Sequence, residues 1–271
     1  MTETSVLSDE MRGTETDVLF LCSVRRKTGA ASASVEARKK RGRGRNTMRI
    51  LFVRHGEPDY AHDCLTPLGA VQAKAAAERL SREGIERIYT SPMGRAMATA
   101  RETADRLGME PETLDFMHEL YWGSTDGTPV FSDGHPWNIA DELARQGWDL
   151  TDKSWPEHPF FRNNRVTEEA AKVARGIDGW LASLGYIREG PYYRCEREDD
   201  RQLTVALFSH GGSSSAAIAR ILNLPFPYVC ALFHMPFTSV TAIRLDRHPG
   251  SVHSPVLELT GDSRHIEGLT V

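Results

Sequence analysis

From Met48 onward, short apolar segments alternate with longer segments that carry helix start signals. Apolar runs of this length are typical of strands that are buried on both faces of a parallel sheet. Strands are expected at 49–53, 85–90, 203–209, 239–246 and 256–261. Helices are expected at 66–84, 91–108, 167–185 and 213–224. The alternation predicts an α/β fold with a mostly parallel central sheet flanked by helices.

Three of the expected helices begin with a residue that can cap them. Thr66 and Ser91 are each followed by a proline, which is favoured at the first helical position. Thr167 is followed by two glutamates, and negative charge in a first turn complements the helix dipole. Thr66, Ser91 and Thr167 are therefore the predicted N-caps.

The N-terminal segment 1–47 differs in composition from the rest of the chain. It carries 10 Lys/Arg and 6 Asp/Glu, and its second half has almost no large apolar side chain. Such a composition cannot bury enough surface to become ordered. We expect a disordered basic tail, or a start site that lies at Met48, with a binding arm and a transit peptide as the alternatives. The folded domain is expected at 48–271.

The folded part is acidic, which restricts its partners. Of 33 basic and 37 acidic residues in the chain, 23 and 31 lie in 48–271. Because an acidic surface binds nucleic acid poorly, no nucleic-acid partner is expected for this part. No apolar run approaches the roughly 20 residues of a membrane span, so no membrane partner is expected. The four cysteines are widely spaced, which favours a reducing, cytoplasmic compartment.

Polar residues follow three of the expected strands, at the sheet edge where ligands bind in parallel α/β proteins. They are Arg54, His55 and Glu57 after 49–53, Arg95 after 85–90, and His210 and Gly211 after 203–209. The stretch HELYWG adds the carboxylate of Glu119.

These residue types match the needs of phosphoryl transfer. Arginine binds phosphate oxygens bidentately, a histidine nitrogen can attack phosphorus, and a carboxylic acid can protonate the departing oxygen. The Walker pattern GxxxxGK[ST] and an obvious acidic metal cluster are absent from the sequence. Cationic side chains are then expected to neutralise the charge, with no cofactor and no metal.

Three ordered motifs resemble those of the histidine phosphatase superfamily, also called the phosphoglycerate mutase-like family. They are RHGE at 54–57, SPxxRAxxTA at 91–100 and SHGG at 209–212. The resemblance covers about 48–260 and implies a three-layer sandwich that acts as a phosphatase on a small phosphorylated substrate. By analogy with relatives alone, it also suggests a homodimer.

The resemblance implies a role for each candidate residue. His55 is the implied nucleophile, and Glu119 is the implied proton donor because it stands four residues before Gly123 in an ExxxG stretch. Asp115 and Asp126 are the competing candidates for the proton donor.

The remaining motif residues are implied to bind phosphate or to support the pocket. Arg54, Arg95 and His210 form the implied phosphate pocket, to which the backbone N–H of Gly211 can add, and Glu57 orients it. Arg95 in a first helical turn opposes the helix dipole, and a bound phosphate would remove that conflict.

One position departs from the family pattern. Many relatives continue RHGE with three residues and then an asparagine, where this chain has Ala61. This difference favours a phosphatase over a phosphoglycerate mutase, which stays an alternative together with a non-catalytic phospho-ligand-binding protein.

The segment 124–165 interrupts the alternation and is rich in Trp, Phe, Pro and Asp. A loop of this length is usually functional or a small subdomain. Since it follows Glu119, we expect a cap insertion over the pocket that sets substrate choice, with Arg162 and Arg165 meeting a second anionic group. The rival is a subdomain that packs only on itself or on a second subunit. The aromatic residues considered for core or substrate contact are Trp122, Phe131, Trp137, Trp148, Trp155, Phe160 and Phe161.

Overall fold

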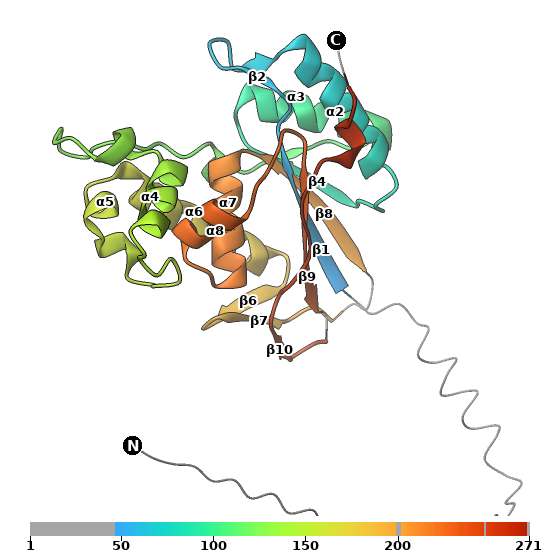
Figure 1. Ribbon diagram of the computed structural model, residues 1–271. Coiled ribbons are helices and arrows are strands. Elements are labelled where there is room, and N and C mark those ends of the chain that lie inside the picture. The colour runs from blue at the N-terminus through green and yellow to red at the C-terminus, as the bar shows by residue number, and fades with distance from the viewer. Residues whose placement is uncertain (1–46, 199–201, 247, 270–271) are drawn as a thin grey trace, which may run out of the picture. The chain divides into compact units, whose positions relative to one another are not determined.

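The computed structural model describes residues 47–198, 202–246 and 248–269, which are built around a six-stranded sheet (Figure 1). The strand order is β11-β9-β1-β8-β4-β5. Their bounds are β1 Thr47–Arg54, β4 Arg87–Thr90, β5 Glu112–Thr113, β8 Leu203–Ser209, β9 Val240–Asp246 and β11 Val256–Asp262. β1, β8, β4 and β5 pair in parallel, whereas β9 is antiparallel to both β1 and β11. The predicted α/β fold is therefore confirmed, with a mixed sheet.

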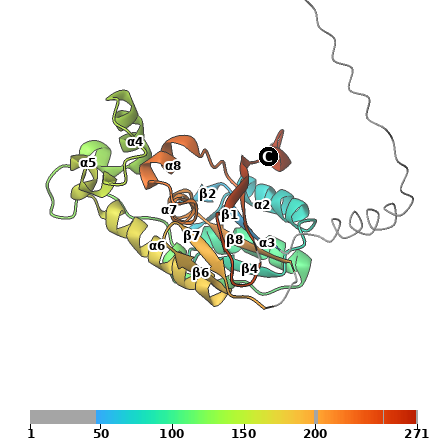
Figure 2. The ribbon, with the colours of Figure 1, turned by 90° about the horizontal axis from the view of Figure 1, so that it is seen from below.

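Helices cover both faces of this sheet. Their bounds are α2 Pro67–Leu80, α3 Gly94–Leu107, α4 Pro136–Arg145, α5 Pro159–Arg162, α6 Arg165–Ser183, α7 Gly211–Leu222 and α8 Phe226–Leu232. Figures 1 and 2 place α2 and α3 on one side of the sheet and α6 and α7 on the other. The result is the expected three-layer arrangement.

The apolar run in β1 is explained by burial on both faces of the sheet. Met48, Ile50 and Phe52 belong to the core on the α6 and α7 side. Leu51 and Val53 belong to the core on the α2 and α3 side. Since successive side chains of a strand point to opposite faces, a central strand needs apolar residues at every position.

Two small sheets and four 3₁₀ helices complete the described residues. One sheet has the order β10-β7-β6, with β6 Tyr186–Glu189, β7 Tyr192–Cys195 and β10 Val252–His253, and the other pairs β2 Pro58–Asp59 with β3 Cys64–Leu65. The 3₁₀ helices are η1 Asp115–Met117, η2 Phe131–Gly134, η3 Trp155–Glu157 and η4 Arg264–Ile266.

One of the three predicted helix caps is found where it was expected. The Thr66 hydroxyl accepts a hydrogen bond from the backbone N–H of Gly69, as an N-cap does. α3 begins at Gly94 instead of Pro92, with Met93 at its N-cap, so the prediction of Ser91 as the cap is wrong. The Ser91 side chain contacts His210 instead.

The start of α6 was also placed too late. Asn164 is its N-cap and accepts a hydrogen bond from the backbone N–H of Val166 at 3.1 Å. Thr167 is the third residue of α6, and its hydroxyl donates to the carbonyl of Phe161. Both Asn and Thr are good caps, and only the tertiary position of the preceding chain decides between them.

Residues 1–46, and with them the predicted tail, lie outside the described residues, but Thr47 is the buried first residue of β1. Among the described residues no single helix is long and apolar enough to span a membrane, although α7 and α8 together, bent by 117°, reach the required length and composition.

Candidate active site

Three parallel strands end at one edge of the sheet and bring the motif residues together. Arg54 at the end of β1 is paired with Ser209 at the end of β8, and Thr90 at the end of β4 is paired with Phe208. The backbone N–H of His55 then donates to the carbonyl of Ser209 at 2.9 Å. The chain segments after these strands therefore meet, as the strand order requires.

His55 is almost completely buried, and its neighbours fix one tautomer. Its Nδ1 lies 2.7 Å from the carbonyl oxygen of Gly56, which can only accept, so Nδ1 carries the proton. The Nε2 atom accepts from Nε of Arg95 at 3.3 Å. Burial, with the charges of Arg54 and Arg95, lowers the pKa of His55 to about 3. The imidazole is thus neutral, with the Nε2 lone pair available.

His210 lies beside His55, with a distance of 5.1 Å between the ring centroids. Its Nε2 contacts the Ser91 hydroxyl at 2.7 Å, and that hydroxyl accepts from the backbone N–H of Met93. Ser91 can therefore donate to Nε2, which leaves the ring proton on Nδ1. Among the described residues Nδ1 has no hydrogen-bond partner although it is buried. Burial lowers the pKa of His210 to about 2.

The Arg54 guanidinium is held by one hydrogen bond and one aromatic ring. Its Nη1 donates to the carbonyl of Met235 at 2.6 Å, and its Cζ lies 4.4 Å from the ring centroid of Phe237. Its buried Nε has no hydrogen-bond partner among the described residues. A buried donor of this kind costs free energy unless an acceptor reaches it.

Arg95 is paired with a carboxylate that sequence reasoning missed. Asp63 Oδ1 accepts from Nη1 of Arg95 at 2.5 Å, and its Oδ2 accepts from the backbone N–H of Gly94 at 2.7 Å. Asp63 therefore supplies the negative charge at the start of α3 that we expected from a phosphate. Its backbone is left-handed, with φ of 49°. Its position in the stretch AHDCLTPLG gave no signal of this pairing.

The side chain of Glu119 reaches the first turn of α7, and two backbone N–H groups donate to one of its carboxylate oxygens. Its Oε1 accepts from the backbone N–H groups of Leu120 at 2.9 Å and of Ser213 at 3.1 Å. The carboxyl group is nevertheless surrounded by protein, and this burial raises its pKa. A Cβ atom on Gly212 would come within 2.5 Å of Oε1, so the second glycine of SHGG makes room for Glu119.

The competing acids occupy different surroundings. Asp115 is exposed at the start of η1. Asp126 is exposed and accepts hydrogen bonds from Thr128 and Asn163, which lower its pKa. Neither lines the cavities described below, so Glu119 alone of the three faces the sheet edge.

Glu57 and Gly211 differ in how closely they approach the site. Glu57 Oε1 accepts from the hydroxyl of Thr66, and its backbone carbonyl accepts from the Thr66 N–H, so Glu57 braces the loop before α2. Gly211 begins α7, and a Cβ atom there would lie 3.5 Å from Trp137 and 3.8 Å from Arg54.

A cavity of about 360 Å³ reaches Arg54, Glu119 and Gly211 of these groups, whereas His55 and His210 are not among its lining residues. It is lined by Arg54, Tyr60, Glu119, Trp122, His135, Trp137, Gly211, Ser215, Cys230, Ala231, Phe233, His234 and Met235. A second cavity shares Tyr60, Glu119 and Trp122 and adds Arg95, Met93, Leu120 and Tyr121. Tyr60 belongs to both cavities, and its ring lies 5.4 Å from Cζ of Arg95.

We expected the segment 124–165 to cover the pocket, but only two of its residues line these cavities. Its residues His135 and Trp137 line the first cavity, together with Trp122 before it. Trp155 packs instead on Phe161 and Phe226.

The two arginines at the end of this segment also lie elsewhere. Arg162 ends α5, and Nε of Arg165 donates to the carbonyl of Ser124. The expectation that they meet a second anionic group at the pocket is not supported by this arrangement. His135 and His234 line the cavity, whereas His118 does not and lies 3.5 Å from Glu169.

A neutral buried histidine, a second imidazole and two arginines thus lie together at the carboxyl edge of this α/β sheet. A model of the histidine phosphatase superfamily (branch 1) matches residues 50–256, and the chain belongs to this superfamily.

Curated and solved relatives agree with this assignment. The chain is 25% identical to "Probable phosphoglycerate mutase GpmB" of Yersinia enterocolitica, over 81% of this chain and 95% of that protein. A mycobacterial glucosyl-3-phosphoglycerate phosphatase, solved with inorganic phosphate, is 28% identical with a TM-score of 0.53, covering 81% of this chain and 99% of its own. "Mycobacterial hydrolase 2" is 29% identical with a TM-score of 0.54, covering 79% and 91%.

Proposed function

We propose that the protein is a metal-independent phosphomonoesterase that works through a phosphohistidine at His55. The observation that carries this proposal is the tautomer of His55, whose Nε2 is unprotonated and accepts a 3.3 Å hydrogen bond from Nε of Arg95, while Nδ1 is bound to the Gly56 carbonyl. A neutral, fixed imidazole is a competent nucleophile towards phosphorus.

The first step breaks the ester bond. Nε2 of His55 attacks phosphorus, the P–O bond to the leaving group breaks, and Glu119 gives its proton to the departing oxygen. The raised pKa of Glu119 favours the protonated carboxyl that this step requires.

The second step restores the enzyme. Water attacks the phosphorus of the phosphohistidine and gives a proton to the Glu119 carboxylate, and the N–P bond breaks to release phosphate. His55 is then neutral again and Glu119 is protonated, so the cycle closes.

The charge of the phosphoryl group is met by fixed donors. Arg54 Nε and His210 Nδ1 are buried donors without partners among the described residues, and a phosphate oxygen at each would satisfy them. Arg54, Arg95 and His210, with the N–H of Gly211, form the proposed phosphate site, and such preorganised donors replace the charge neutralisation of a metal ion.

The cavity favours a small substrate with an uncharged leaving group. Among the described residues that line the two cavities, Arg54 and Arg95 are the only arginines and no lysine is present. Tyr60, Trp122 and Trp137 offer aromatic surface instead. Phosphoglycerate mutase, suggested by the names of relatives, needs to hold a carboxylate beside the phosphate and is the second candidate.

Trapping the intermediate tests the proposal. Wild-type protein mixed with a ³²P-labelled aryl phosphate is expected to carry an acid-labile, base-stable label, in excess EDTA as well as without it. The variant His55→Ala is expected to lose the label and about 10⁴-fold or more in kcat while keeping its circular dichroism spectrum. His62→Ala, an exposed histidine on the neighbouring loop, is the control.

Two outcomes would overturn the proposed mechanism. Substantial turnover by folded His55→Ala would show that His55 is not the nucleophile, and loss of activity in EDTA would show that a metal takes part. Isomerisation of 3-phosphoglycerate that depends on added bisphosphoglycerate, at a rate exceeding hydrolysis, would favour the mutase.

A further inference from the structure

A cluster of two histidines and one aspartate lies at the opposite edge of the sheet from His55. Asp246 ends β9 and is paired with Thr47, at the other end of β1 from Arg54. The eight residues of β1 place this edge roughly 20 Å from the candidate active site. His248 and His253 follow on the chain that leads from β9 into β10.

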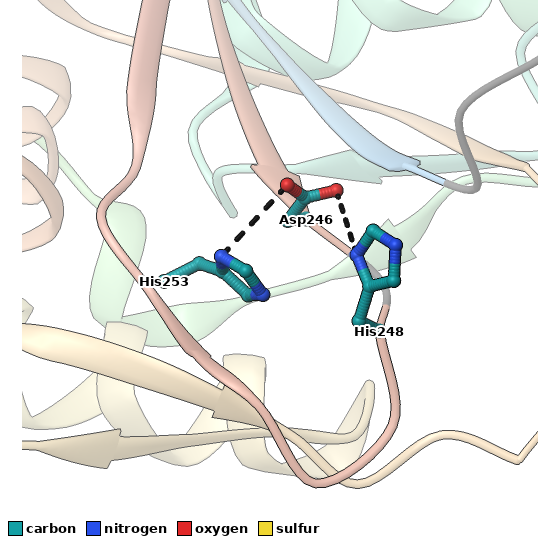
Figure 3. Close-up of side chains that lie close together, drawn as sticks. All are labelled: Asp246, His248 and His253. Carbon is teal, nitrogen blue, oxygen red and sulfur yellow. Dashed lines mark ion pairs between the residues drawn. The ribbon is translucent and has the colours of Figure 1, made fainter. Parts of the chain in front are cut away.

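The two imidazole rings face the two oxygens of the Asp246 carboxylate. Figure 3 shows both imidazole rings directing a nitrogen towards the Asp246 carboxylate. Nδ1 of His248 lies 3.5 Å from Oδ1, and Nδ1 of His253 lies 3.9 Å from Oδ2. One ligand atom from each residue lies within 4.8 Å of the others. In a tetrahedral zinc site with bonds near 2.0–2.1 Å, ligand atoms are about 3.3 Å apart. A small movement of these side chains towards one another would therefore let all three atoms bind one zinc ion.

Ser251 determines which nitrogen of His253 carries a proton. The Ser251 hydroxyl donates to the carbonyl of His248 at 2.5 Å, and the same oxygen lies 2.6 Å from Nε2 of His253. Because a hydroxyl has only one proton, Nε2 must donate to Ser251. In the neutral ring of His253, Nδ1 then carries a lone pair that faces Oδ2 of Asp246. Nδ1 and Oδ2 are both acceptors, and no proton lies between them.

The carboxylate of Asp246 gives a further observation that favours a bound ion at this cluster. Its Oδ1 atom is shielded from water and has no hydrogen-bond partner among the described residues. A carboxylate oxygen in that position costs free energy unless a positive charge reaches it.

We propose that Asp246, His248 and His253 bind a divalent transition-metal ion, of which Zn²⁺ is the best match. Two imidazole nitrogens and one carboxylate oxygen are borderline ligands that suit Zn²⁺, Co²⁺ or Ni²⁺ better than Mg²⁺ or Ca²⁺. The Ser251 hydroxyl supplies the outer hydrogen bond that orients a ligating imidazole. His248 is exposed, so water completes the coordination. The ion would fasten β10 and its sheet to the end of β9.

The alternative occupant is a proton, which would turn an imidazole into an imidazolium paired with Asp246. A zinc titration distinguishes a metal ion from a proton as the occupant. Its outcome does not depend on the proposed phosphatase activity. Full-length protein without a tag is freed of metal with a chelator, transferred to chelator-free buffer at pH 7.5, and titrated with Zn²⁺ by calorimetry. The variants are His248→Ala, His253→Ala and Asp246→Asn.

We expect one zinc per chain in wild type and at least a tenfold weaker affinity in each variant. At a zinc concentration a hundred times Kd, the melting temperature should rise by roughly 5–10 °C. Co²⁺ should give the visible absorption bands of a low-symmetry site in wild type and lose them in His248→Ala. The control is His62→Ala, which removes an exposed histidine 2.7 Å from Asp59 and should bind zinc as wild type does.

Two results would overturn the proposal. One is the absence of saturable zinc binding to folded wild type. The other is binding that His248→Ala and His253→Ala leave unchanged, which would place the ion elsewhere. Because His248 is exposed, its replacement is expected to keep the fold, so an unfolded Asp246→Asn variant does not spoil the test.

Discussion

Burial shifts the pKa values of the two side chains that are proposed to react. The pKa of His55 is lowered to about 3 and that of Glu119 is raised, in both cases mainly by burial. The proposed first step needs a neutral His55 and a protonated Glu119. Activity should therefore rise as pH passes above about 3 and fall as pH passes above the raised pKa of Glu119.

The variant Glu119→Gln tests this assignment. Glutamine keeps the hydrogen bonds from Leu120 and Ser213 but cannot give up a proton. We expect kcat to fall about 10²–10⁴-fold for alkyl phosphates and far less for p-nitrophenyl phosphate, whose leaving group needs no proton. The pH profile of the variant should also lose its alkaline limb. An equal loss for both ester classes would show that Glu119 is not the acid.

Asp63 is predicted to be a positioning residue for Arg95. It accepts hydrogen bonds from both Arg95 and the start of α3, so it fixes the guanidinium in front of His55. Charge-assisted hydrogen bonds contribute about 1.5–3 kcal/mol, so Asp63→Ala should lower kcat/KM roughly ten- to hundred-fold. The effect should fall mainly on KM and on the inhibition constant of inorganic phosphate.

The neighbouring Asp59→Asn is the matched control, since that carboxylate contacts the exposed His62 and the backbone N–H of Ala61 within its own loop. If Asp63→Ala leaves phosphate inhibition unchanged or strengthens it, Asp63 competes with the phosphate for Arg95 instead of aligning it.

At the scale of elements, the order of strands and helices was predictable and their starts were less so. The strands 49–53 and 203–209 are recognisable because burial on both faces demands continuous apolar residues. Helix starts at Ser91 and Thr167 were wrong because several nearby residues can cap, and Ser91 is used by His210. The hairpin of β6 and β7 was missed, since its strands of four residues mix aromatic and charged side chains.

The segment 124–165 gives a prediction that separates its two tryptophans. Trp137 lines the cavity, whereas Trp155 packs on Phe161 and Phe226. Trp137→Ala should change the ranking of phosphate esters by roughly ten- to hundred-fold, with aryl esters losing most. Trp155→Ala should keep the ranking and lower the free energy of unfolding by about 3 kcal/mol.

Kinetics on an ester panel and urea denaturation measure these two effects. If Trp137→Ala keeps the wild-type ranking, the segment does not set specificity through this side chain.

For the whole molecule, the buried neutral imidazoles predict sensitivity to mild acid. His55 and His210 have pKa values lowered to about 3 and about 2, against about 6.5 in the unfolded chain. Below pH 6.5 the unfolded state therefore binds more protons than the folded state, and stability falls as pH falls. Between pH 7 and 5 the two groups together should cost about 2–4 kcal/mol.

Urea denaturation at both pH values measures this slope, and His210→Gln should reduce it by about half. A slope that is the same in wild type and His210→Gln would contradict the assignment.

The candidate site was partly predictable for a topological reason. Residues after parallel strands must meet at one edge, so Arg54, His55 and His210 could be grouped without coordinates. Asp63, Tyr60 and the cluster around Asp246 could not, because loops and chain reversals bring them into place and no local pattern records that.

The central position of β1 has a consequence for how the chain acquires its structure. β1 is the first strand of the described residues, yet its two neighbours are β8 and β9, which begin 156 and 193 residues later. At a synthesis rate of roughly 5–20 residues per second, the first strand waits about 8–30 seconds for β8 and about 10–40 seconds for β9. Long-range pairing of this kind slows folding, and an unpaired apolar strand is prone to aggregate. The nascent chain should therefore depend on chaperones until the segment 203–246 has left the ribosome.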